Sequence, residues 1–324
     1  MNEGIKRAAG TLEGQYRVLR SQGYHIVGRH SAVKTCHWTR EAITGGESCY
    51  KSKFYGIQSH RCLQMTPAVS RCTNMCLYCW RVLPHEHGYP LVDGCVEDPP
   101  EAIVDGAIAA QRRVLSGYKG NAKTDPDRFM EAMDPRHAAI SLSGEPTEYS
   151  MLDGLIREFK RKGMTTFLVT NGTNPKRLGE IPEPTQLYVS LSAPSEEVYR
   201  SVCRPASGAS WGRLVESLSL LKSFSCPTVI RMTAVRGLNM IDPDGYSKII
   251  SGASPTYVEV KAYMHVGFSV TRLGYESMPS HAEIVQFARD LAERTGYELA
   301  GEVPISRVAL LSRIGKPKKV SASI

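Results

Sequence analysis

Short apolar runs alternate with longer amphipathic stretches along most of the chain. Six runs have the length and β-branched content of buried strands, at residues 61–69, 137–142, 165–170, 186–191, 228–234 and 257–263. Apolar residues recur at helical spacing near residues 101–118, 149–162, 211–224 and 241–250. Strands that alternate with helices predict a parallel sheet, because each helix returns the chain to the same edge. Periodicity alone does not distinguish a curved partial barrel from a doubly wound sheet.

Both ends of the chain extend beyond these six units. Residues 1–30 are predicted to be mostly helical. A helix near 281–295 is followed by strands or a hairpin, and then by a basic tail; these are residues 297–302, 307–313 and 316–320. Since no long Pro/Gly/Ser linker separates these parts, we expect an N-terminal extension over 1–60, a core over 61–280 and a C-terminal extension over 281–324.

Composition is that of a globular protein with an acidic partner. The chain has 324 residues, of which 42% are hydrophobic, and it carries a formal charge of +8. It has no run of eighteen apolar residues and no apolar leader after Met1, so we expect a cytoplasmic protein that does not span a membrane. The excess of basic groups is compatible with a phosphate backbone, and equally with a solvated surface.

Three cysteines on one short loop are the most informative feature of the sequence. Cys72, Cys76 and Cys79 have the spacing C-x3-C-x2-C. Three such thiolates can hold three irons of a 4Fe-4S cluster and leave the fourth iron open for a ligand. Zinc usually takes four ligands in C-x2-C pairs, and no second pair is near. The loop resembles that of radical S-adenosylmethionine (SAM) enzymes, which implies that SAM binds the open iron and that Tyr78 lies beside its adenine.

A second group of cysteines lies upstream. Cys36, Cys49 and Cys62 are each thirteen residues apart. A disulfide framework is one interpretation, but in a cytosolic protein clustered cysteines more often bind metal. Beside the first group, they are candidates for a second cluster with three protein ligands. Three other cysteines have no partner spacing and are expected to be buried thiols, namely Cys95, Cys203 and Cys226.

The segments around these upstream cysteines resemble the tRNA 4-demethylwyosine synthase family of archaea and eukaryotes. The resemblance rests on residues 47–57 and 59–67 and extends over nearly the whole chain. It implies that the upstream cysteines hold a second 4Fe-4S cluster and that Lys51 holds pyruvate as a Schiff base. A primary amine with a lowered pKa can condense with an α-keto acid, although most lysines are simply solvated; Lys53 is the reserve candidate.

Polar residues follow the predicted strands, where ligands bind in parallel α/β folds. We expect these residues to contact SAM, and the candidates are Ser143, Gly144, Glu145, Thr170, Asn171, Ser190 and Ser192. Glu145 and neighbouring carbonyl groups would accept hydrogen bonds from the ammonium group of SAM. Each motif alone is weak evidence, because Gly, Asn and Ser are common in turns.

The resemblance implies a partial (β/α)6 barrel and a radical SAM lyase. The enzyme would condense N1-methylguanosine of tRNA(Phe), beside the anticodon, with carbons of pyruvate to form 4-demethylwyosine, through a 5′-deoxyadenosyl radical. We expect its cofactors to be two 4Fe-4S clusters and SAM. We also expect a separate electron-donor protein and a monomeric chain. One alternative is another radical SAM enzyme with an auxiliary cluster that acts on a peptide or protein. The other is a non-enzymatic metal-cluster protein that binds RNA and cleaves no SAM.

Overall fold

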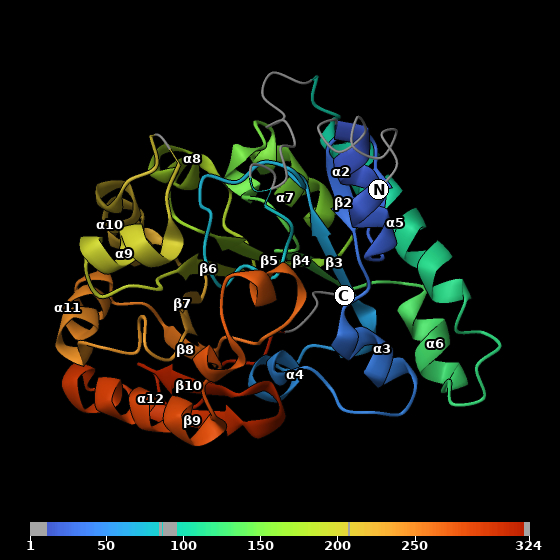
Figure 1. Ribbon diagram of the computed structural model, residues 1–324. Coiled ribbons are helices and arrows are strands. Elements are labelled where there is room, and N and C mark those ends of the chain that lie inside the picture. Colours follow the sequence, from blue (N-terminus) through green and yellow to red (C-terminus); the bar gives the residue numbers. More distant parts are fainter. Residues whose placement is uncertain (1–11, 84–85, 87–95, 207, 321–324) are drawn as a thin grey trace. The chain divides into compact units, whose positions relative to one another are not determined.

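The computed structural model describes residues 12–83, 86, 96–206 and 208–320 (Figure 1). The chain divides into two compact units. The first unit consists of residues 1–72, 82–167 and 320–324, and the second of residues 73–81 and 168–319. The three segments predicted from the sequence divide the chain differently and stay a prediction.

The first unit is built on four strands in the order β1-β2-β3-β4. β1 (His25–Val27) and β2 (Ser31–Val33) form an antiparallel hairpin, and β3 (Cys62–Thr66) pairs antiparallel with β2 and parallel with β4 (His137–Ile140). Its helices are α2 (Leu12–Ser21), α3 (His37–Ile43), α4 (Tyr50–Tyr55), α5 (Pro100–Ser116), α6 (Pro126–Ala132) and α7 (Leu152–Arg161), with 3-10 turns at Ser59–Arg61 and Pro146–Glu148. The division between the units falls within β5 (Thr165–Thr170).

The second unit contains three parallel strands and an antiparallel pair. β6 (Gln186–Ser190), β7 (Thr228–Ala234) and β8 (Tyr257–Ala262) are parallel, and β10 (Val308–Ser312) lies between β8 and β9 (Glu298–Val303), antiparallel to both. Its helices are α8 (Pro175–Glu180), α9 (Glu196–Cys203), α10 (Trp211–Ser219), α11 (Pro243–Ala253) and α12 (His281–Thr295), with 3-10 turns at Leu220–Ser223, Gly267–Thr271, Tyr275–Ser277 and Pro304–Ser306. α12 runs beside β9 and β10 (Figure 1).

The predicted fold class, α/β with parallel strands and flanking helices, is confirmed, and the sheet is open rather than a closed barrel. The predicted ends of helices and strands agree best with the structure where the sequence carries strong local signals. A capping box between Ser280 and Glu283 begins α12, and Gly296 ends it in the left-handed conformation. The predicted strands at 165–170 and 228–234 also have the bounds observed.

The prediction of a mostly helical N-terminus is wrong in part. Residues 12–21 form α2, but residues 25–27 form β1; residues 1–11 lie outside the described residues. The turn at Gly28, in the left-handed conformation, joins β1 to β2 and makes the hairpin possible. Among the helices that the structure describes, none is long and apolar enough to cross a bilayer.

The far end of the described chain returns to the first unit. The backbone N–H of Val320 donates a hydrogen bond to the carbonyl of Tyr55 at 2.7 Å. Tyr55 is the last residue of α4 and is fully buried. Val320 and Tyr55, far apart in the sequence, thus belong to the same first unit.

A buried histidine joins three segments of the first unit. His137 lies in β4; its Nε2 accepts a hydrogen bond from the Gln58 backbone N–H at 3.1 Å, and its Nδ1 lies 2.7 Å from Thr165 Oγ1. Because Nε2 accepts, the ring is neutral and donates from Nδ1. Burial, followed by the nearby charges of Arg61 and His60, lowers the pKa of His137 to about 4.

Acid should therefore destabilise this unit through His137. Since the folded-state pKa lies below that of an unfolded histidine, the stabilisation is complete above roughly pH 6.5 and is lost as the pH falls toward roughly 4. We expect a loss of about 2 kcal/mol in the free energy of unfolding between roughly pH 7 and roughly pH 5. Urea unfolding of the wild type and of His137→Gln measures it: the variant should lack this part of the pH dependence. Equal falls in both proteins would contradict the assignment.

Candidate active site

The upstream cysteines come together in the first unit. Cys36 immediately precedes α3, Cys49 immediately precedes α4, and Cys62 begins β3; all three are partly buried. Burial, followed by the proximity of Cys36 and Cys49, raises the pKa of the Cys62 thiol. The three thiols therefore lie near enough to one another for Cys36 and Cys49 to act electrostatically on Cys62.

Polar side chains fix the backbone around these thiols. The backbone N–H of Cys49 donates to Ser59 Oγ at 2.9 Å, and Thr39 Oγ1 donates to the Ser59 carbonyl at 3.0 Å. Gln111 Nε2 donates to the Cys62 carbonyl at 3.2 Å. Thr39 and Ser59 belong to the same stretch of sequence as the cysteines, whereas Gln111 reaches them from α5.

Lys51 faces the cysteine group from the first turn of α4. Its charge lowers the pKa of both Cys36 and Cys62, although burial raises these pKa values more. Its Nζ lies 5.0 Å from the centre of the Phe167 ring, an arrangement that favours a cation. Lys53, in contrast, is 51% exposed and pairs with Glu47 at 3.8 Å. The structure thus places Lys51, and not Lys53, at the thiols.

Two of the predicted SAM residues hold the backbone that leads to Cys72. Ser143 Oγ donates to the Val69 carbonyl at 3.1 Å. Gly144 has a φ of +66°, and a Cβ built on it would lie 1.7 Å from the Ala68 oxygen and 2.5 Å from the Arg71 oxygen. Only a glycine permits so close an approach of the two backbones.

Glu145 is buried at the same place. Its backbone N–H donates to the Arg71 carbonyl at 2.7 Å. Its carboxylate accepts hydrogen bonds from the Thr147 N–H at 3.2 Å and from Thr147 Oγ1 at 2.8 Å. The carboxylate therefore caps the turn at 146–148, and its contact with SAM stays a prediction.

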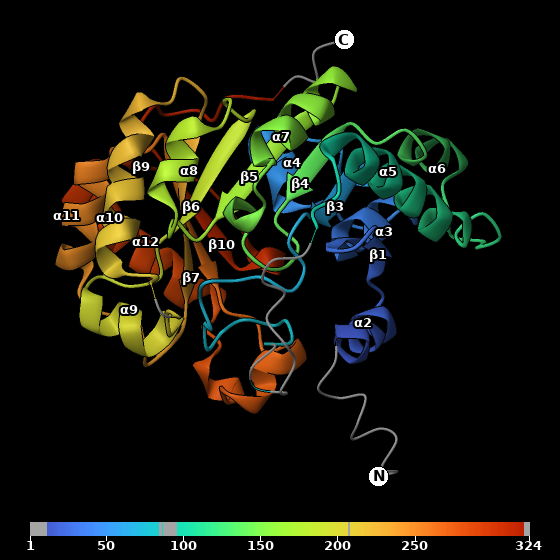
Figure 2. The ribbon, with the colours of Figure 1, turned by 90° about the horizontal axis from the view of Figure 1, so that it is seen from above.

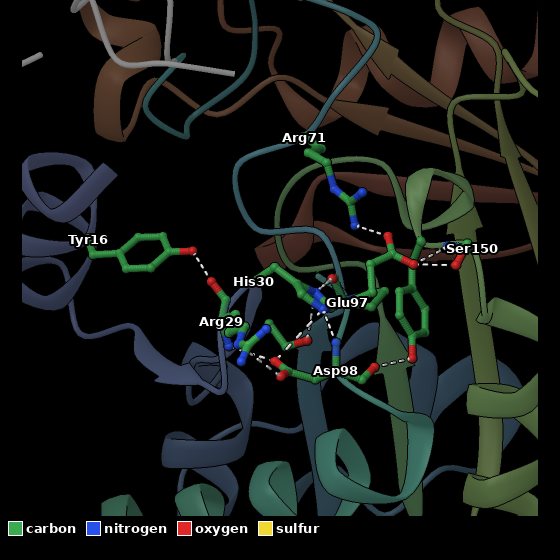
Figure 3. Close-up of polar contacts among 10 residues, drawn as sticks. Tyr16, Arg29, His30, Arg71, Glu97, Asp98 and Ser150 are labelled. Atoms are coloured by element: carbon green, nitrogen blue, oxygen red, sulfur yellow. Dashed lines mark hydrogen bonds and ion pairs between the residues drawn. The ribbon is translucent and has the colours of Figure 1, made fainter. Parts of the chain in front are cut away.

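An ion pair anchors Arg71, the residue before Cys72 (Figure 3). Its Nη2 lies 2.6 Å from Glu97 Oε1, and Glu97 also accepts hydrogen bonds from the Ser150 N–H and hydroxyl. Burial opposes ionisation of Glu97, but the hydrogen bonds from Ser150 and Arg71 outweigh it and lower the pKa of its carboxyl. The guanidinium therefore has a charged partner at neutral pH.

In the second unit, Tyr78 reaches the end of β6. Its hydroxyl donates to Ser192 Oγ at 3.0 Å and lies 3.9 Å from the buried Cys203 thiol. Burial raises the pKa of Tyr78, so the hydroxyl stays neutral. Two residues predicted to contact SAM thus lie together, and Cys203 is a neighbour that no sequence motif predicted. Cys226 is only partly buried, and Cys95 lies outside the described residues.

The other strand-end candidates have defined positions in the second unit. Asn171 Nδ2 donates to Thr73 Oγ1 at 2.8 Å, which ties the end of β5 to the cysteine loop. Thr170 is buried and accepts a hydrogen bond from the Gly172 N–H at 3.0 Å. Ser190 is partly buried in β6, opposite Arg231 of β7.

Arg272 also holds the cysteine loop, and sequence reasoning missed it. Its Nε donates to the Leu77 carbonyl at 3.1 Å, and its Nη2 donates to the carbonyl of Cys79. In Figure 2 the light-blue loop lies beside the orange segment that contains Arg272. Burial raises the pKa of the Cys79 thiol, while the charges of Arg81 and Arg272 act in the opposite direction. The two cations only partly offset burial, so the Cys79 thiol keeps its proton.

Both cysteine groups have the donor chemistry of iron-sulfur sites. In the described ranges, no three His, Cys, Asp or Glu side chains are arranged to hold a single metal ion. The thiolates of a cubane cluster bind separate irons, however, so they need not converge on one point. A hydrogen bond from Cys203, followed by burial, raises the pKa of Cys76. Iron would replace the protons that these buried thiols otherwise keep.

Two segments of the chain match known protein families. Residues 67–246 match the Radical SAM superfamily, and residues 252–313 match a family described as Wyosine base formation. The chain is similar to the S-adenosyl-L-methionine-dependent tRNA 4-demethylwyosine synthase of Pyrococcus abyssi, with 49% identity over 91% of this chain and 87% of that protein. The Methanocaldococcus jannaschii enzyme of the same name is 42% identical over 91% of this chain and 94% of its own. A solved structure of TYW1 with a lysine-pyruvate adduct bound superposes with a TM-score of 0.84 and 39% identity, covering 95% of this chain and 98% of that one.

Proposed function

The chain belongs to the tRNA 4-demethylwyosine synthase family of radical SAM enzymes, and from that premise we propose which of its residues perform the reaction. It is an enzyme of wyosine biosynthesis that uses SAM and a 4Fe-4S cluster and acts on tRNA. Family membership favours this function over a peptide-modifying enzyme and over a non-enzymatic RNA-binding protein.

Cys72, Cys76 and Cys79 are the proposed ligands of the SAM-binding cluster. When bound, this cluster would supply the electron for cleavage of SAM to a 5′-deoxyadenosyl radical, which would take hydrogen from the N-methyl group of N1-methylguanosine in tRNA(Phe). Ser143, Gly144 and Glu145 fix the backbone before the first ligand. The proposed SAM contacts are Tyr78, Ser143, Gly144, Glu145, Thr170, Asn171, Ser190 and Ser192.

Lys51 is the proposed pyruvate-binding residue, beside a second 4Fe-4S cluster on Cys36, Cys49 and Cys62. One observation carries this proposal: the Lys51 ammonium lies near enough to two of these thiols to lower their pKa values. The lysine amine attacks the keto carbon of pyruvate and water leaves, which gives a lysine-pyruvate adduct. The related structure with such an adduct supports a lysine in this role.

Three further features of the proposal concern the setting of the enzyme. A separate protein supplies the electron, the chain acts as a monomer, and it works in the cytoplasm, where tRNA is used. These features follow from the family resemblance and from composition, and each stays a prediction.

Anaerobic cluster reconstitution tests the proposal. We expect about eight irons per chain in the wild type and about four in each triple variant, Cys36/Cys49/Cys62→Ala and Cys72/Cys76/Cys79→Ala. The first variant should cleave SAM without forming 4-demethylwyosine, and the second should do neither. Iron and sulfide are counted by colorimetry, and products by mass spectrometry with tRNA, SAM and pyruvate.

The two halves of the proposal fail differently. About four irons in the wild type, with product still formed, would make the upstream cysteines structural. Absence of SAM cleavage by the fully loaded wild type would contradict the assignment of Cys72, Cys76 and Cys79.

A further inference from the structure

A hollow of about 410 Å³ opens in the second unit beside the cysteine loop. It lies where α9 ends and α10 begins, two helices that are neighbours in Figure 1. The residues that matter here are Met75, Glu196, Arg200, Arg204 and Trp211, all of which line it. Its volume is within the range of pockets that hold small ligands or single nucleotide units.

Backbone hydrogen bonds tie this hollow to the cysteine loop. The N–H of Met75 donates to the carbonyls of Cys203 at 3.0 Å and of Arg204 at 3.1 Å. The N–H of Ala206 donates to the Thr73 carbonyl at 2.8 Å, and Asn74 pairs with Pro205 in an isolated β-bridge. Met75 lines the hollow and directly precedes Cys76. The hollow therefore adjoins the segment that carries the proposed cluster ligands.

Arg204 has an unusual backbone conformation at this point. It ends α9 with a φ of 47° and a ψ of 63°, the left-handed region that side chains other than Gly, Asn and Asp rarely adopt. Such a conformation costs about 1 kcal/mol or more and persists where the surrounding structure holds it. Here the hydrogen bond from the Met75 N–H to the Arg204 carbonyl holds this conformation.

The lining combines cations with an aromatic surface. Arg200 is 72% exposed, and its guanidinium pairs with Glu196 at 2.6 Å. Trp211 is partly buried against Tyr199, with ring centres 5.6 Å apart and an interplanar angle of 52°. An indole held in this way offers a face for stacking at little cost in side-chain entropy.

We propose that this hollow binds one nucleotide of the single-stranded anticodon loop of the tRNA substrate. Its base stacks on Trp211, and its phosphate lies against Arg204 and Arg200, displacing Glu196 from Arg200. Unpaired bases of RNA loops are commonly recognised by stacking on aromatic rings, with arginines at the phosphates. The net charge of +8 agrees with a polyanionic partner. This inference rests on the proposed function and adds where the RNA is held.

Binding of a labelled tRNA(Phe) anticodon stem-loop to the reconstituted protein tests it, measured by fluorescence anisotropy over a range of salt concentrations. Trp211→Ala should weaken binding about tenfold and leave the salt dependence unchanged, since stacking is not a charge effect. Arg204→Gln and Arg200→Gln should weaken binding and each reduce the slope of log K against log salt by about 0.7. Arg289→Gln, an exposed arginine of α12, is the matched control and should change neither quantity.

The outcomes separate this inference from the proposed function. Arg200→Gln alters an exposed side chain, so it remains informative even if Trp211→Ala loses iron. Suppose that Arg200→Gln and Arg204→Gln bind with wild-type affinity and salt slope while the wild type still forms 4-demethylwyosine. This result would overturn the proposal for the hollow and leave the proposed function standing. An equal loss in Arg289→Gln would also overturn it, because the effect would then be one of overall charge. Failure of the wild type both to bind the stem-loop and to form product would overturn both.

Discussion

Lys51→Ala should abolish formation of 4-demethylwyosine while both 4Fe-4S clusters stay bound. We expect product formation to fall at least about 10³-fold, because the adduct with pyruvate needs the amine itself and no neighbouring side chain replaces a covalent contact. Cys36, Cys49 and Cys62 keep their backbone supports in this variant, since Ser59, Thr39 and Gln111 are unchanged. Iron counting and mass spectrometry of the tRNA measure the two results.

Lys53→Ala is the matched control, two residues away on the same short helix. Lys53 pairs with Glu47 at the surface, so its removal should change turnover by less than about twofold. Borohydride reduction in the presence of labelled pyruvate adds a direct test. It should label the wild type and Lys53→Ala, and should not label Lys51→Ala. Labelling of Lys51→Ala, or normal turnover by it, would show that another group binds pyruvate.

Gly144→Ala should destabilise the first unit strongly and displace the backbone that leads to Cys72. A methyl group at this position would lie 1.7 Å from the Ala68 oxygen, so two backbone segments have to separate. Strain from the positive φ adds about 1 kcal/mol, and we expect a total loss of about 4 kcal/mol in the free energy of unfolding. Urea unfolding and iron content measure the effect, and the iron lost should be that of the SAM-binding cluster.

Gly163→Ala separates the clash from the conformational strain. Gly163 belongs to the same unit and has a φ of +71°, but the nearest atom to its Cβ would be Arg136 Nη1 at 3.5 Å. This variant should lose only about 1 kcal/mol and keep its iron. Similar losses in the two variants would mean that the contact with Ala68 and Arg71 does not matter.

Much of the fold could be predicted from local patterns, but the order of its strands could not. The apolar runs of β5 and β7 and the capping signals of α12 specify their own bounds. The insertion of β10 between β8 and β9 depends on pairing between segments far apart in the sequence. The short elements between the upstream cysteines, α3 and α4, also escaped prediction, because seven and six residues are too few to show a helical period.

The site divides in the same way. The cysteine spacing and Lys51 could be recognised from the sequence, because one short stretch contains them. Phe167 and Arg272 could not, since each reaches the site through tertiary contact and lies in a segment without a motif. Glu145 was predicted for its charge, whereas its observed partner is the Thr147 hydroxyl in the following turn.

The hydrogen bond from Val320 to the Tyr55 carbonyl affects the order in which the protein folds. Tyr55 ends the helix that carries Lys51, so the carbonyl at the end of this helix obtains this partner only when residue 320 has been synthesised. Contacts with so large a sequence separation form late, because a long loop has to close first. We expect the helix that carries Lys51 to be completed late in folding, and removal of residue 320 to take this partner away from its last residue.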